Sequence, residues 1–330
     1  LEGLVIVRSW GFKSPLRHSN TRKVFVPEVS KPKVRRLLVL AFIVALLSVG
    51  VYAVDTPSAF LLALIPLAYT IPAFAWLDRL EPEPRAMRWN AFLWGAGISI
   101  LVAGLANEFT DASFGYSAAL VISAPVAEEI MKALGILGAA KRQQLDSPLD
   151  GAIYAGYVGI GFAMVENVIY FSQAITDGDL GLVFVLRGLF SPFAHPFFTL
   201  WVGLAVGRAV RHGRSRRFAA IRGLVPATAL HAAWNASGLN IVFTFLLLGH
   251  ILLFFIMVRY LRRLRYDEVT HVRGRLPQLA FTHNLSPIEI DSYGDLRATR
   301  RLRRSLPRHQ RAAFDERRLM ITKLALKEET

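Results

Sequence analysis

The sequence contains no cysteine among its 330 residues. That absence excludes disulfide frameworks, thiolate metal sites and cysteine nucleophiles together. Charged residues are scarce as well, at 19%, whereas 53% of the residues are hydrophobic. This balance excludes a disordered chain, and it argues against nucleic acid as a partner despite the formal net charge of +15. Residues 1–36 hold nine Lys and Arg and no long apolar stretch, so we expect no cleavable secretory signal in them.

Long apolar stretches fill the middle of the chain, and a helix needs about 20 such residues to cross a bilayer. The sequence therefore predicts an all-α, polytopic membrane protein with about eight transmembrane helices. The predicted spans are Leu37–Val54, Thr56–Leu77, Trp89–Asn107, Phe114–Ala140, Leu149–Thr176, Leu180–Gly207, Phe218–Leu239 and Ile241–Val258. They divide the chain into a basic N-terminal segment (1–36), a transmembrane domain (37–258) and a basic C-terminal tail (259–330).

The positive charges predict how the chain crosses a cell membrane. If the N-terminus is cytoplasmic and the spans alternate, 36 of the 39 Lys and Arg fall on the cytoplasmic side and the outer turns hold none. Membrane proteins show this bias, so we expect both termini in the cytoplasm. The tail is predicted to attract anionic lipid headgroups at that face, with an amphipathic helix over Asp315–Lys327. A merely solvated, partly disordered tail is the alternative.

Charged and polar residues interrupt four consecutive predicted spans. At the centre of a span each charge costs about 2.5–3.5 kcal/mol, so such residues need partners and often mark function. Glu128 and Glu129 precede Lys132 by one helical turn, which lets the ammonium pair with both carboxylates. The next three spans contribute Glu166, His195, and His231 with Asn235. One such residue is often only an interhelical hydrogen bond, whereas the whole set predicts an active site inside the helix bundle.

These residue types suit the activation of water. A carboxylate and an imidazole can share the roles of general base and acid, and a second imidazole with an amide can stabilise an oxyanion. Two histidines and a carboxylate also meet the ligand count of a catalytic zinc site. If a divalent metal such as zinc is used, the predicted ligands are Glu166, His195 and His231.

Other activities use similar residues. A proton-coupled transporter is the alternative, because buried Glu and His chains also relay protons, although we find no related halves in the sequence. A lipid-modifying membrane hydrolase is a further alternative. The strings His-Glu-x-x-His, Gly-x-Ser-x-Gly and Gly-x-Gly-Asp are all absent from the sequence.

Four motifs occur in order, each on its own predicted span. They are Glu128-Glu129-x-x-Lys132, Phe162-x-x-x-Glu166-Asn167, His195-Pro196 and His231-x-x-x-Asn235. Together they resemble the PrsW family of intramembrane proteases, relatives of the CAAX-processing and Abi membrane proteases. The string from Asp78 to Pro84 also resembles a segment of that family.

The resemblance implies proteolysis of a membrane-anchored, single-span protein, such as an anti-sigma factor, near the extracytoplasmic side. It implies that Glu128 or Glu129 is the base, that His195 positions or activates the water, and that His231 and Asn235 form the oxyanion group. The CAAX enzymes more often have histidine at the position of Glu166, so the role of Glu166 stays open, as does the need for a metal. The spacing agrees with an outer cut, because Glu166 and His231 lie roughly 15 and 12 Å from the outer ends of their spans.

Overall fold

The computed structural model describes residues 56–141, 145–237 and 243–326, together with short helical pieces between residues 36 and 50. The predicted basic segment 1–36 and much of the predicted span Leu37–Val54 lie outside the described residues, as does the predicted outer turn at Asn240. All regular elements in the described ranges are helices, which confirms the all-α fold class.

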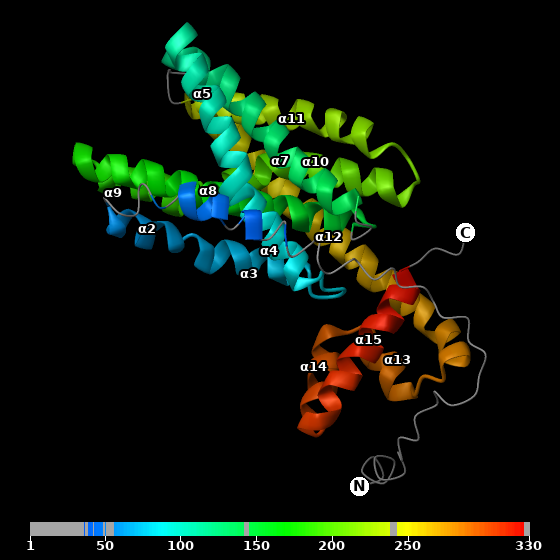
Figure 1. Cartoon of the computed structure of the whole chain (residues 1–330). Coiled ribbons are helices and arrows are strands. Elements are labelled where there is room, and N and C mark those ends of the chain that lie inside the picture. The colour runs from blue at the N-terminus through cyan, green and yellow to red at the C-terminus, as the bar shows by residue number, and fades with distance from the viewer. Residues whose placement is uncertain are drawn as a thin grey trace.

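The first part of the described chain forms three helical units (Figure 1). The first unit is α2 (Pro57–Leu64) with α3 (Leu67–Leu77). The second unit is α4 (Arg85–Leu93), the π-helical η3 (Trp94–Ser99) and α5 (Ile100–Phe114). The third unit is α6 (Tyr116–Ala118), the π-helical η4 (Ala119–Ser123) and α7 (Ala124–Lys141). Gly115, at φ 85°, makes the turn between the second and third units.

The remaining bundle helices follow in order. They are α8 (Pro148–Asp177), α9 (Leu180–Val183), the π-helical η5 (Phe184–Phe190), α10 (Ala194–Arg211), α11 (Arg216–Ser237) and α12 (Phe243–His283). A capping box starts α8: the Ser147 hydroxyl accepts from the Asp150 backbone N–H while the Asp150 carboxylate accepts from the Ser147 N–H. Gly178, in the left-handed conformation, ends α8.

Five stretches of the described chain are long and apolar enough to cross a membrane: Pro57–Leu77, Arg85–Phe114, Pro148–Asp177, Leu180–Arg211 and Phe245–His283. They confirm a polytopic membrane protein and coincide with five of the predicted spans. Two further predicted spans are helical, as α6–α7 and as α11, and α7 contains the charged cluster. The total of eight spans stays a prediction.

Glycines bring α8 and α10 into contact at the level of the backbone. A Cβ added at Gly151 would lie 2.0 Å from the Gly203 carbonyl oxygen, and one added at Gly159 would lie 2.6 Å from the Pro196 backbone nitrogen. Small residues permit such close approach between membrane helices. Because His195 immediately precedes Pro196, the contact at Gly159 fixes His195 against α8.

The span that contains His195 is interrupted. Residues 191–193 form a break between η5 and α10, and His195 lies in the first turn of α10. Pro192 lies in this break and Pro196 follows it, as expected for residues that remove helical hydrogen bonds. Such irregular backbone inside a membrane protein is tolerated where it is buried or lines a cavity.

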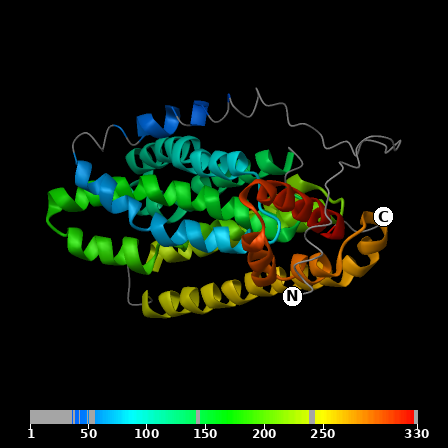
Figure 2. The same cartoon turned by 90° about the horizontal axis from the view of Figure 1, so that it is seen from below.

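The C-terminal part of the chain is folded. Helix α12 continues without interruption across residues 258 and 259, where the sequence suggested a domain boundary. Beyond it, α13 (Pro287–Tyr293), α14 (Leu296–Ser305), the short 3-10 helix η6 (Arg308–Gln310) and α15 (Arg311–Leu326) gather at one end of the bundle (Figures 1 and 2). Their core includes Val272, Tyr293 and Ile321 as well as Leu80 from the loop between α3 and α4. The predicted amphipathic helix Asp315–Lys327 falls largely within α15.

Candidate active site in the helix bundle

The first component of the site is a buried ion cluster on α7. The Lys132 ammonium lies 3.2 Å from Glu128 Oε2 and 2.9 Å from Glu129 Oε1, and all three residues are buried. Their spacing on one helix places the ammonium beside both carboxylates, as the sequence predicts. The Lys132 ammonium also lies 3.9 Å from the centre of the Phe162 ring of α8, a cation–π contact.

His195 connects this cluster to α8. Its Nδ1 lies 3.0 Å from Lys132 Nζ, and its Nε2 lies 2.6 Å from Glu166 Oε2. The Glu166 carboxylate also accepts a hydrogen bond from Arg187. Arg187 in turn donates to Asn167 Oδ1 at 3.1 Å, so a chain of polar contacts runs from η5 through Glu166 to the α7 cluster.

His231 approaches the same carboxylates from α11. Its Nδ1 lies 3.1 Å from Glu129 Oε1 and its Nε2 lies 3.8 Å from Glu128 Oε2. Its ring stacks on Phe198 of α10, with the ring centres 4.8 Å apart. The two imidazole rings, of His195 and His231, are 5.3 Å apart and nearly perpendicular.

The two glutamates of α7 differ in their hydrogen bonding. Both oxygens of Glu129 are engaged, Oε1 by Lys132 and His231 and Oε2 by the Thr199 hydroxyl at 3.0 Å. Among the residues that the structure describes, Lys132 alone lies within hydrogen-bond distance of Glu128 Oε2, and a nitrogen of each histidine lies 3.8 Å away. A separation of 3.8 Å is too long for a direct hydrogen bond. Glu128 is therefore the carboxylate with capacity for another partner.

Five of the six predicted site residues meet in this cluster, and the sixth has another partner. Asn235 lies one turn beyond His231 on α11, but its Nδ2 donates to the backbone carbonyl of Leu120 at 2.9 Å. Arg187, which holds Glu166, was not among the predicted site residues. The sequence could have indicated it, because an arginine inside an apolar stretch needs an acidic partner.

Three of these residues have the geometry of a metal site. Glu128, His195 and His231 each offer one ligand atom, and the three atoms lie within 4.8 Å of one another. One carboxylate and two imidazoles form a donor set that suits zinc. Glu166, the predicted third ligand, is outside this group because Arg187 and His195 hold its carboxylate. The Lys132 ammonium, beside Glu128 and His195, would repel a metal ion bound there.

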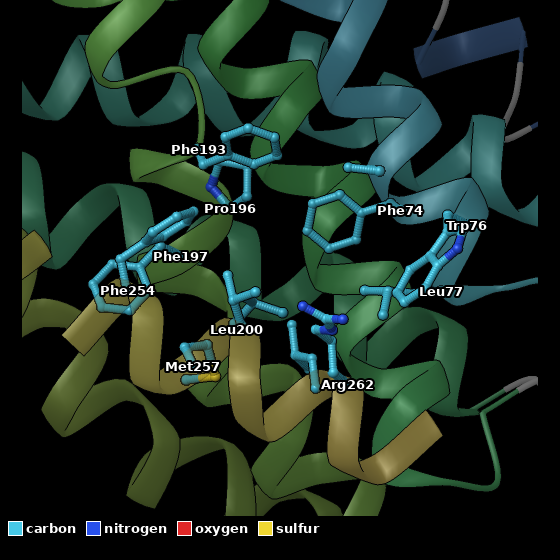
Figure 3. A pocket seen from close by; sticks show the side chains of 13 residues that line it. Phe74, Trp76, Leu77, Phe193, Pro196, Phe197, Leu200, Phe254, Met257 and Arg262 are labelled. Carbon is cyan, nitrogen blue, oxygen red and sulfur yellow. The ribbon is translucent and has the colours of Figure 1, made fainter. Parts of the chain in front are cut away.

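Side chains from α3, α10 and α12 line a separate apolar cavity (Figure 3). Its volume is about 400 Å³, and its lining includes Phe74 of α3, Leu200 of α10 and Phe254 of α12. Helical geometry directs Phe193, Pro196, Phe197 and Leu200 toward this cavity, whereas His195 and Thr199 face the carboxylates of α7 and α8. The cavity is therefore separated from the ion cluster by α10 itself.

Comparison with known proteins identifies the family. Residues 83–261, more than half of the chain, match the family described as PrsW family intramembrane metalloprotease. The chain belongs to the PrsW family. It is 32% identical over 166 residues to Protease PrsW of Clostridioides difficile strain 630, covering 48% of this chain and 68% of that protein. It is 27% identical over 146 residues to Protease PrsW of Geobacillus kaustophilus strain HTA426, covering 43% and 62% of the two chains. No solved structure matches this chain at a significant level.

Membership of the PrsW family makes this chain a multi-pass membrane peptidase, and it favours the protease over the transporter considered above. All six predicted site residues lie within the matched segment, whereas α13, α14 and α15 lie beyond it. The more distant relation to the CAAX-processing enzymes stays a prediction.

Proposed function

We propose that this PrsW-family protease hydrolyses a peptide bond with a water molecule activated by Glu128. The observation that carries the proposal is the position of Glu128 Oε2, 3.8 Å from His195 Nδ1 and 3.8 Å from His231 Nε2. Polar groups too far apart for a direct hydrogen bond can share a water molecule beside them. A water held there would lie against a carboxylate base and two imidazoles at once.

The surrounding residues have supporting roles in this proposal. Glu166 accepts the Nε2 proton of His195, which leaves Nδ1 as the acceptor that faces the cluster. Glu129 holds His231 and Lys132 in place. As Glu128 takes a proton from water, the water oxygen attacks the carbonyl carbon of the peptide bond, and the oxyanion forms beside His231. The C–N bond then breaks as the proton passes from Glu128 to the leaving amine. One amide hydrogen of Asn235 is donated to the Leu120 carbonyl, and in this proposal the other would donate to the oxyanion.

A metal is the alternative at this site, because the donor set suits zinc, whereas the neighbouring Lys132 ammonium opposes a bound cation. Glu128, His195 and His231 would hold it, and a bound zinc ion would supply a Lewis acid that lowers the pKa of water. Glu129, which is bound to His231 and to Lys132, would then be the paired glutamate left to act as the base.

We further propose that the substrate is a single-span membrane protein, of the anti-sigma-factor type, cut near the extracytoplasmic side. With both termini in the cytoplasm, α8 and α11 end on the outer side. His231 lies roughly 9 Å from the end of α11 at Ser237, and Glu166 roughly 17 Å from the end of α8 at Asp177. Both distances favour access of water and substrate from outside. At the cytoplasmic face, the basic C-terminal region would attract anionic lipid headgroups.

Membrane proteomics on cells that express the wild type or Glu128→Gln tests the proposal. Glutamine keeps the size of the side chain but cannot take a proton, so we expect single-span proteins to accumulate uncut in this variant. The matched control is Glu108→Gln, at an exposed position on α5, which should behave as the wild type. Undiminished cleavage by Glu128→Gln would exclude Glu128 as the base, and new termini on the cytoplasmic flank would exclude the outer cut.

A further inference from the structure

A cavity lined by arginines lies where the C-terminal helices meet the loop between α3 and α4. Its volume is about 420 Å³. Four of its arginines come from α14 and α15, and the fifth, Arg79, comes from the loop. The five are Arg79, Arg300, Arg303, Arg304 and Arg318. The acidic residue in the lining is Asp315.

The positive charge of this cavity is largely uncompensated. Asp315 is engaged by Arg303, whose Nε lies 2.9 and 2.8 Å from its two carboxylate oxygens. Within the described ranges of the chain, Arg79, Arg300 and Arg304 form no ion pair with a carboxylate. Concentrated charge of one sign around a concave surface attracts an ion of the opposite sign.

Arg318 shows that the cavity is part of a folded unit and not of a loose tail. This residue is buried, and its guanidinium donates to the backbone carbonyl of Leu80 at 2.9 Å. Nearby, the Lys323 ammonium lies 3.3 Å from Glu81 Oε1. The cavity therefore requires both the C-terminal helices and the loop of the membrane domain.

We propose that this cavity binds a phosphate-bearing anion. Guanidinium groups bind phosphate oxygens through paired, charge-assisted hydrogen bonds, and several of them around one cavity match the charge of a phosphate group. Arg79 follows the membrane helix α3, which ends at Leu77, so a phospholipid headgroup can reach the cavity as well as a soluble phosphate compound. A bound anion would join α14 to the membrane domain through Arg79. The inference is independent of the proposed proteolysis.

The test uses the purified full-length protein and two ligands. In the first arm, inorganic pyrophosphate is titrated into the protein in detergent, and binding is measured by calorimetry. In the second arm, the protein is placed in nanodiscs of pure phosphatidylcholine or in nanodiscs that also contain phosphatidylglycerol, and the two preparations are compared. In the nanodisc arm the readout is protection of the 296–305 backbone from hydrogen exchange. The pocket variant is Arg300→Gln/Arg304→Gln. The matched control is Arg297→Gln/Arg301→Gln, which removes the same charge from exposed positions of the same helix outside the cavity lining.

We expect the wild type and the control variant to bind alike, and the pocket variant to bind about tenfold more weakly. Binding of pyrophosphate alone would identify a soluble ligand, and protection by phosphatidylglycerol alone would identify a headgroup. Either result supports the proposal. Equal losses in the pocket and control variants would overturn it in favour of diffuse attraction, as would the absence of binding in both arms. Thermal unfolding of each variant checks that the helices remain folded.

Discussion

Lys132 holds a positive charge at the centre of the buried cluster, and replacing it tests how the cluster is balanced. Its ammonium is fully buried and lies 3.2 and 2.9 Å from Glu128 and Glu129. In Lys132→Met the side chain keeps its approximate length but loses the charge. Two buried carboxylates are then left close together without their shared cation.

The expected loss of stability is large. Removing one partner of a buried ion pair typically costs about 3–5 kcal/mol, because the remaining charge stays buried and uncompensated. For a protein of this size that corresponds to a fall in melting temperature of roughly 5–15 °C. The measurement is thermal unfolding of the purified protein in detergent. The matched control is Lys141→Met, at the exposed end of the same helix, which should melt with the wild type.

A second substitution separates charge balance from packing. Glu129→Gln/Lys132→Met buries one negative charge fewer than Lys132→Met, so we expect the double variant to regain part of the lost stability. If Lys132→Met melts with the wild type, or if the double variant melts below Lys132→Met, the carboxylates are not held by the ammonium and our account of the cluster is wrong.

Three further predictions follow from other contacts. Gly159→Ala should reduce activity strongly, because its Cβ would lie 2.6 Å from the Pro196 backbone nitrogen and displace the start of α10; unchanged activity would contradict this. Arg187→Gln should lower both activity and melting temperature, because it removes the cation that holds Glu166, and a variant that matches the wild type in both would contradict this role. Burial raises the pKa of Glu83 to about 8. The protonated side chain therefore stabilises the folded protein fully at a pH below the pKa of the unfolded chain, and this stabilisation is lost as the pH rises through 8. Glu83→Gln should therefore match the wild type near pH 5 and melt at a higher temperature above pH 8; an unchanged pH dependence would refute this.

The charged motif on α7 could be predicted from sequence because helix geometry alone determines it. Lys132 is one turn from both glutamates, and no tertiary contact is needed to bring them together. The convergence of polar residues from four helices could also be predicted, because polar groups that face lipid are costly and need partners inside the bundle. Which imidazole faces which carboxylate depends on the rotation of each helix, and periodicity does not determine that. For this reason the contact between Glu166 and Arg187, and the bond from Asn235 to a backbone carbonyl, were not predicted.

The C-terminal helices were predicted less well for a different reason. Arginines dominate residues 296–304 and conceal the apolar positions around them. Tyr293 and Ile321 are fully buried, yet each is separated from its partners by many residues and by turns. The sequence does not show what the apolar face of a single amphipathic helix packs against. In the structure, that face packs against α12 and the loop at Leu80.

The close contacts of α10 divide the candidate site into two parts. A Cβ at Gly223 of α11 would lie 2.6 Å from the Val202 backbone, much as Gly151 meets Gly203 between α8 and α10. Helices α8, α10 and α11 are thus joined through backbone contacts and carry both histidines as one rigid frame. Helix α7 carries Glu128 and Glu129, and its Gly135 packs against the side chain of Trp94 and not against a neighbouring backbone. A small sliding of α7 would therefore change the distances from Glu128 and Glu129 to both imidazoles, while the two imidazoles keep their spacing and His195 keeps its contact with Glu166.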